Sequence, residues 1–111
     1  MKKADFSELA DKTCVITGGA GVIGSSIVEG LAAAGMNTVI LDINAELAEK
    51  VAGEVKSKTR ARVLGLKADV LDRSSLEAAR DKIHAEFGRI HFLINGAGGN
   101  SPKATTKVEE M

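Results

Sequence analysis

Residues 13–24 read Thr-Cys-Val-Ile-Thr-Gly-Gly-Ala-Gly-Val-Ile-Gly, and this segment indicates the architecture of the chain. A short apolar run is followed at once by a glycine-rich turn, which leads into a segment with helical spacing of apolar residues. Gly19, Gly21 and Gly24 form the pattern G-x-G-x-x-G. The first glycine permits a tight turn, the second lets the backbone approach a pyrophosphate, and the third lets the helix pack closely on the strand. The helix dipole at this point also favours negative charge. The predicted phosphate-binding residues are Gly18, Gly19, Gly21, Val22, Ile23 and Gly24.

Four apolar runs of strand length recur along the chain. They are rich in Val, Ile and Leu and show little polar alternation, which is typical of strands covered on both faces in a parallel sheet. The predicted strands are Thr13–Thr17, Asn37–Asp42, Arg62–Ala68 and Ile90–Asn95.

Three segments with helical spacing lie between these runs. We expect the first helix to stop at Gly35 and the second to begin after Asn44 as its N-cap. The third is expected to begin with Ser74 and Glu77 in capping-box spacing and to end at Gly88. The predicted buried stripes are Ile23, Ile27 and Leu31 in the first helix, Leu47, Val51 and Val55 in the second, and Leu76, Ala79, Ile83 and Phe87 in the third.

The resulting element order is βαβαβαβ. Strands that alternate with helices favour right-handed crossovers and a parallel sheet, so the fold class is α/β. A Rossmann-type doubly wound sheet has the strand order 3-2-1-4, and ligands bind above the carboxyl ends of strands 1 and 4. The glycine loop after the first strand and a second one at Gly96, Gly98 and Gly99 are therefore expected to face one ligand.

Asp42 ends the second predicted strand, 18 residues after Gly24. A carboxylate there can accept hydrogen bonds from an adenosine ribose diol, whereas a 2′-phosphate would meet like charge. The next residues, Ile43 and Asn44, supply no cation. The sequence thus favours NAD over NADP, and residues 1–111 are interpreted as the N-terminal portion of one NAD-binding Rossmann domain.

Composition excludes several other classes of protein. Fifteen basic and fifteen acidic residues cancel, so neither nucleic acid nor a membrane surface is an expected partner. No apolar stretch reaches the length of a membrane span, and residues 1–8 do not resemble a signal peptide. The one cysteine, Cys14, lies in an apolar run, which fits a reducing compartment and a cytoplasmic location. His84 and His91 are not at metal-ligand spacing, so no metal site is expected.

The chain resembles the short-chain dehydrogenase/reductase superfamily. Three segments carry the resemblance: Thr17-Gly18 through Gly24, Asp69-Val70 after the third strand, and Asn95-Gly96-Ala97-Gly98 after the fourth. The resemblance implies that Asp69 and Val70 contact the adenine. It also implies that Asn95, Ala97 and Gly98 stabilise the central sheet and border the cofactor.

The glycine spacing leaves the branch of the superfamily open. Thr17, Gly18, Gly21 and Gly24 fit T-G-x-x-G-x-x-G, which is more typical of nucleotide-sugar epimerases and dehydratases, because single-domain dehydrogenases usually have glycine where Val22 stands. The Asn95–Gly98 segment favours the dehydrogenases. Residues 99–106 are similar to a stretch of D-mannonate oxidoreductase (fructuronate reductase-like) members. That likeness implies hydride transfer between NAD and a secondary alcohol of a sugar acid. A non-catalytic dinucleotide-binding module is the third alternative.

Enzymes of this superfamily use a Tyr, a Lys four residues later and a Ser, and the chain has no Tyr. We therefore expect no catalytic residue in it. The chain is interpreted as truncated before the Tyr-x-x-x-Lys segment and inactive alone. Lys103 is the one candidate substrate contact, because a sugar acid carries a carboxylate. A homo-oligomer is expected only for the full-length protein. The fourth strand would form an open sheet edge, so its apolar residues are expected to be partly uncovered and the isolated chain to associate.

Overall fold

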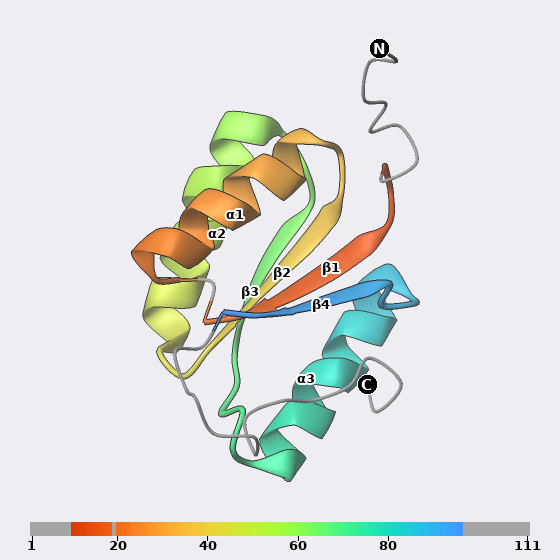
Figure 1. The fold of residues 1–111 in the computed structure, drawn as a ribbon. Coiled ribbons are helices and arrows are strands. Elements are labelled where there is room, and N and C mark those ends of the chain that lie inside the picture. The colour runs from red at the N-terminus through yellow and green to blue at the C-terminus, as the bar shows by residue number, and fades with distance from the viewer. Residues whose placement is uncertain (1–9, 19, 97–111) are drawn as a thin grey trace.

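The computed structural model describes residues 10–18 and 20–96, and of Val22 and Ile23 it describes only the backbone. Within these residues, seven elements alternate between strand and helix, as the sequence predicts (Figure 1). They are β1 (Thr13–Thr17), α1 (Val22–Ala33), β2 (Asn37–Asp42), α2 (Ala45–Thr59), β3 (Val63–Lys67), α3 (Arg73–Phe87) and β4 (Phe92–Asn95).

The four strands form one parallel sheet in the order β3-β2-β1-β4, which confirms the Rossmann-type α/β prediction. In the register of the sheet, Val15 of β1 lies between Val39 of β2 and Leu93 of β4. The bounds of β1 and β2 agree with the sequence prediction. Strand β3 is one residue shorter at each end, and β4 begins two residues later than predicted.

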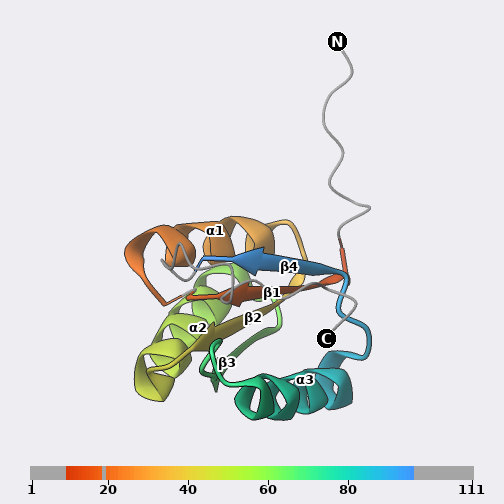
Figure 2. The same ribbon diagram turned by 60° about the horizontal axis from the view of Figure 1, so that its bottom comes forward.

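The helices cover the two faces of the sheet unequally. Helices α1 and α2 lie on one face and α3 lies on the other (Figure 2). Side chains that alternate along the strands separate accordingly: Cys14 and Ile16 face α1 and α2, whereas Val15 and Leu41 face α3. Burial raises the pKa of the Cys14 thiol to about 11, because a thiolate would lose its hydration. Strand β1 thus contributes apolar side chains to the hydrophobic cores on both faces of the sheet.

The predicted buried stripes of α1 and α2 are partly wrong. Ile27 and Leu47 are 38% and 39% exposed. The face that meets the sheet carries smaller side chains, which are Val28 and Ala32 in α1 and Ala48, Val51, Ala52 and Val55 in α2. Alanines allow a helix to approach the sheet closely. The buried face is therefore shifted by one position, from Ile27 to Val28 in α1 and from Leu47 to Ala48 in α2. The stripe of α3 is confirmed, with Ala79 and Ile83 buried and Leu76 and Phe87 packed against them.

The ends of the helices agree with the sequence at three places and differ at one. Gly35 lies two residues after the end of α1 and Gly88 directly follows α3, with positive φ angles of 89° and 78°, and Asn44 caps α2 by accepting from Leu47 N. The Ser74 capping box is wrong. Helix α3 begins one residue before Ser74, because the Asp72 carboxylate accepts from the amides of both Ser74 and Ser75.

Strand β4 lies at an edge of the described sheet, and its side chains are incompletely covered, as predicted. Phe92 is 41% exposed, and Leu93 and Ile94 are half-buried. Beside it lies an apolar pocket of about 430 Å³, which is lined by Cys14, Leu31, Met36, His91, Phe92, Leu93 and Ile94. None of the helices in the described ranges is long and apolar enough to cross a membrane.

Candidate nucleotide-binding site

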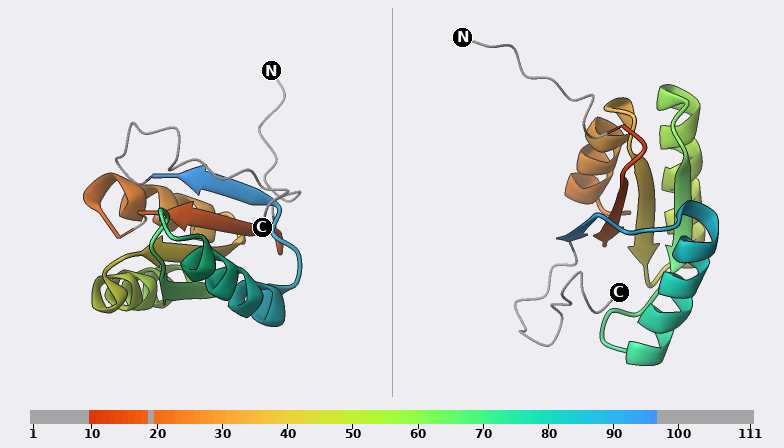
Figure 3. Two further views of the ribbon diagram at one scale, coloured as in Figure 1. Left: turned by 90° about the horizontal axis from the view of Figure 1, so that it is seen from below. Right: turned by 90° about the vertical axis from the view of Figure 1, so that its right-hand side faces the viewer.

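A pocket of about 470 Å³ lies at the carboxyl ends of the strands. The arrowheads of β1 and β4 point to the same end of the molecule, where β1 leads into α1 (Figure 3, left). The chain therefore brings the loops after β1, β2, β3 and β4 together at this end. The pocket is lined by Gly18, Gly21, Leu41, Asp42, Ile43, Leu47, Ala68, Asp69, Val70, Leu71 and Gly96.

The glycine loop forms one wall of the pocket. Gly18 has a φ of 68°, a conformation that favours glycine, and its N–H donates to Leu41 O at 2.7 Å. Gly21 is the N-cap of α1, has no side chain to cap the helix, and no acidic residue follows in the first turn. The amides of the first turn of a helix have no acceptor within it, so this end of α1 suits an anion. Gly24 is buried within α1.

The Asp42 carboxylate is held in place at the end of β2. Its Oδ1 accepts from Asn44 N at 3.0 Å, and Asn44 in turn caps α2. One carboxylate oxygen thus anchors the turn, and a carboxylate has a second oxygen to offer a ligand. Ile43 is 65% exposed, and none of the described lining residues is basic. Among the described residues, the pocket therefore carries two carboxylates, those of Asp42 and Asp69, and no cation.

The loop after β3 forms the facing wall. Ala68 N donates to Asp42 O at 2.9 Å, which joins this loop to the end of β2. Asp69 Oδ1 accepts from Leu71 N at 3.0 Å, and Asp69 N donates to Ser75 Oγ at 2.9 Å. Asp69 and Val70 thus line the same pocket as Asp42.

The end of β4 is fastened to the end of β1. Thr17 Oγ1 donates to Asn95 Oδ1 at 2.9 Å, and Gly96 N donates to Thr17 O at 2.8 Å. A Cβ atom at Gly96 would lie 2.8 Å from Thr17 O, so a larger residue cannot occupy this position without a shift. Asn95 ties the two strands together but is not among the lining residues, whereas Gly96 is.

Several predicted residues lie outside what the structure describes. They are Gly19, Ala97, Gly98 and Lys103, together with the side chains of Val22 and Ile23. Sequence reasoning also missed lining residues, chiefly Ile43, Leu47 and Leu71, which are large apolar side chains left exposed beside the two acids. The signal that could identify these residues is their exposure to solvent, which can be recognised only from the fold.

The histidines have no metal-binding arrangement in the described part of the chain. No group of three or more His, Cys, Asp or Glu side chains that could hold a metal ion occurs there. His91 instead has a structural contact, because its Nδ1 accepts from Thr13 N at 3.0 Å and continues the pairing of β4 with β1.

Comparison with known proteins identifies the family. The model of the short chain dehydrogenase family matches residues 12–111. The chain belongs to the short-chain dehydrogenase family. This family consists of NAD(P)-dependent oxidoreductases, and its Rossmann-type fold is the one observed in the chain.

Relatives of known sequence or structure cover nearly all of the chain. UxuB of Bacillus subtilis, an uncharacterized oxidoreductase, is 48% identical over 101 residues, which are 91% of this chain and 36% of UxuB. A Haemophilus influenzae protein assigned as a D-mannonate oxidoreductase, solved with NAD bound, is similar with a TM-score of 0.78 and 38% identity over 85% of this chain and 33% of that one. The L-sorbose reductase of Gluconobacter frateurii, solved with NADPH and L-sorbose, has a TM-score of 0.81 and 31% identity over 88% of this chain and 37% of the reductase. The chain thus spans about a third of the length of these relatives.

Proposed function

We propose that this chain is the cofactor-binding portion of an NAD-dependent dehydrogenase that interconverts a secondary alcohol and a ketone of a sugar acid, such as D-mannonate and D-fructuronate. One observation carries the proposal: the glycine loop, Asp42 and the Asp69-Val70 loop line a single pocket at the carboxyl ends of the strands. Ligands of doubly wound sheets bind at this position. The Haemophilus influenzae protein, with NAD bound, supports the substrate class as well as the cofactor.

Each wall of the pocket has a distinct role in this proposal. Gly18, Gly19, Gly21 and the α1 amides of Val22, Ile23 and Gly24 bind the pyrophosphate. The Asp42 carboxylate accepts hydrogen bonds from the adenosine ribose diol, and Asp69 and Val70 contact the adenine. Asn95, Ala97 and Gly98 border the remainder of the cofactor. Lys103 is the proposed partner of the substrate carboxylate. These last assignments extend into the part of the chain that the structure does not describe.

NAD supplies the hydride acceptor in this proposal, and the described residues bind and orient its adenosine half. The carboxylate at Asp42 discriminates between cofactors, because a 2′-phosphate beside it would be repelled and no cation among the described lining residues offsets that repulsion. The L-sorbose reductase was solved with NADPH, so proteins of this fold differ in the cofactor they bind. In this proposal, the charge at Asp42 sets the preference of the present chain.

A ligand-observed NMR titration of the chain with NAD and NADP tests the cofactor preference. We expect NAD to bind at least tenfold more tightly than NADP, which corresponds to about 1.4 kcal/mol. Asp42→Ala should weaken NAD binding and remove most of the preference. Asp81→Asn, on the exposed surface of α3, is the matched control and should change neither affinity. Equal or tighter binding of NADP by the unaltered chain would refute the assignment to Asp42.

A test of the substrate class requires a protein that contains both this chain and the catalytic residues of the family. Such a protein should reduce D-fructuronate with NADH and oxidise D-mannonate with NAD, as followed by NADH absorbance. Turnover of other sugar alcohols without activity on either acid would reject the sugar-acid assignment and leave the cofactor assignment standing.

A further inference from the structure

We propose that Ser75 is a positioning residue that fixes the adenine-side wall of the pocket. The inference rests on the proposed function, since it concerns how the same pocket holds the adenosine half of a dinucleotide. Ser75 itself is not among the residues that line the pocket. It acts through the loop of residues 69–71, which we call the adenine-side loop.

The Ser75 hydroxyl bridges this loop and helix α3. Its Oγ accepts a hydrogen bond from Asp69 N at 2.9 Å, across six positions of sequence. Ser75 lies in the first turn of α3 and is half-buried. The backbone of Ser75 is held in turn, because its amide donates to Asp72 Oδ1 at 3.4 Å. The adenine-side loop is therefore fastened to the beginning of a regular helix.

The other contacts of Asp69 are local and would move with the loop. Asp69 Oδ1 accepts from Leu71 N at 3.0 Å, and Asp69 O accepts from Asp72 N at 3.0 Å. Both partners lie within three residues, so they set the shape of the loop but not its position on the molecule. Of the hydrogen bonds that Asp69 makes within the described residues, the one to Ser75 alone reaches into α3.

The position of this loop matters because two apolar side chains on it face the pocket. Val70 and Leu71 both line it, and Leu71 is 69% exposed. The contact of an apolar side chain with a purine stabilises a complex only when the side chain is held where the ring will lie. A loop that must be ordered during binding loses that part of the affinity as conformational entropy.

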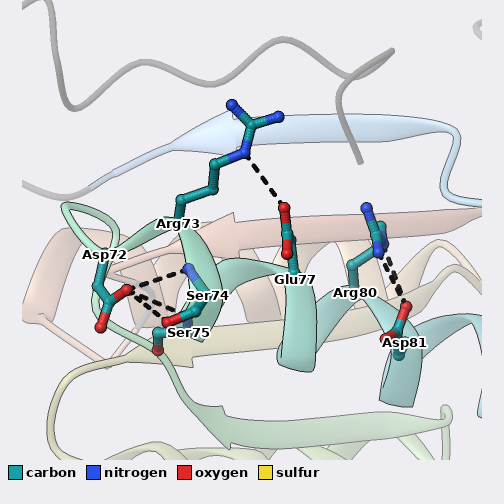
Figure 4. Close-up of polar contacts among 7 residues, drawn as sticks. All are labelled: Asp72, Arg73, Ser74, Ser75, Glu77, Arg80 and Asp81. Carbon is teal, nitrogen blue, oxygen red and sulfur yellow. Dashed lines mark hydrogen bonds and ion pairs between the residues drawn. The ribbon is translucent and has the colours of Figure 1, made fainter.

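Ser74, the neighbouring residue, provides a matched comparison. Its hydroxyl donates to Asp72 Oδ1 at 2.8 Å and is exposed (Figure 4). It thus contributes to the same helix cap, and among the described residues its hydrogen bonds go to Asp72 and not to the adenine-side loop. Loss of either hydroxyl removes one hydrogen bond at the start of α3, and only the loss of Ser75 releases Asp69.

The test compares Ser75→Ala, Ser75→Thr and Ser74→Ala in the full 111-residue chain. Ligand-observed NMR measures the affinities for AMP and NAD, and hydrogen exchange read by mass spectrometry reports on residues 69–72. We expect Ser75→Ala to weaken both ligands about three- to fivefold and to speed exchange at the adenine-side loop, as the loss of one net hydrogen bond implies. Ser75→Thr keeps a hydroxyl and should restore both properties. Ser74→Ala should bind both ligands like the unaltered chain.

Each other outcome is decisive. If Ser75→Ala binds AMP and NAD normally, the positioning role is wrong and the proposed function is untouched. If Ser74→Ala weakens binding equally, or if Ser75→Ala speeds exchange throughout α3, the serine is a helix cap only and the inference fails. If the unaltered chain binds neither AMP nor NAD, the proposed function fails, and the inference fails with it.

Discussion

At Gly65 the sheet and a helix are in very close contact. It lies in β3 against α2, and a Cβ atom there would fall 2.6 Å from the carbonyl carbon of Ala48 and 2.9 Å from Glu49 N. These are backbone atoms, which cannot rotate away. Gly65→Ala should therefore destabilise the fold by about 2–3 kcal/mol, because the added methyl overpacks the contact between helix and strand. Urea unfolding followed by circular dichroism measures this change.

Gly53 provides the control for Gly65. It lies in α2, is exposed, and has open space where a Cβ would be. Gly53→Ala should stabilise the chain by about 0.5–1 kcal/mol, because alanine loses less backbone entropy in a helix. The same substitution is thus expected to have opposite signs at the two sites. Equal effects at both would mean that β3 and α2 are not as closely packed as described.

At the residue scale, the sequence predicts the polar part of the pocket better than its apolar part. The glycines and Asp42 follow a pattern that encodes backbone geometry, so their positions could be derived from spacing alone. Ile43 and Leu71 obey no pattern. Ile43 directly follows β2, and Leu71 lies four residues after the end of β3. In the sequence, both resemble ordinary apolar residues. Only the fold reveals that both are exposed and line one pocket.

At the scale of elements, the beginning of α3 depends on the charge of Asp72. Its carboxylate accepts from Ser74 Oγ and from the amides of Ser75 and Ser74, and these bonds lower the pKa of the carboxyl below its ordinary value of 3.8 (Figure 4). A lowered pKa stabilises the folded state above the unfolded value, and the stabilisation is lost as the pH falls through the folded one. Asp72→Ala should therefore lower Tm by a few degrees at neutral pH.

Two further variants separate the cap from its charge. Asp72→Asn keeps an acceptor for the helix amides, so it should retain most of the neutral-pH Tm while losing the pH dependence below 3.8. Asp81→Asn removes an exposed acid that pairs with Arg80 at 3.1 Å, and it should leave Tm nearly unchanged. Thermal melts by circular dichroism between acid and neutral pH provide the data. An unaltered Tm in Asp72→Ala would contradict the assigned cap.

The elements also show which sequence signals are reliable. Strands β1 and β2 were predicted to the residue, because strands buried on both faces are continuous apolar runs that end where polar turns begin. Helical faces were harder to predict. In α1 and α2 the large residues Ile27 and Leu47 remain exposed, and alanines meet the sheet. A pattern based on large side chains cannot identify the helix face on which alanines let the helix lie close to the sheet. The Ser74 box failed because Asp72 is a competing cap two residues earlier, and Glu77 pairs with Arg73 at 3.1 Å.

At the scale of the whole molecule, the two edges of the sheet are unequal. Strand β3 packs extensively against α2, whereas β4 lies beside an apolar pocket of about 430 Å³ with Phe92 41% exposed. An exposed edge strand with apolar side chains is a template for association. The 111-residue chain is therefore expected to self-associate at concentrations where a fully covered domain of its size stays monomeric. Sedimentation velocity measures this tendency.

The association should depend on the edge rather than on total charge. Phe92→Lys places a cation on the exposed side of β4, where a second chain would have to desolvate it, and should shift the sedimenting species toward the monomer. Ala85→Lys adds the same charge to an exposed position of α3 and should leave the association unchanged. If both variants dissociate the chain equally, electrostatic repulsion is responsible and β4 is not the contact. A monodisperse monomer for the unaltered chain would contradict the predicted self-association.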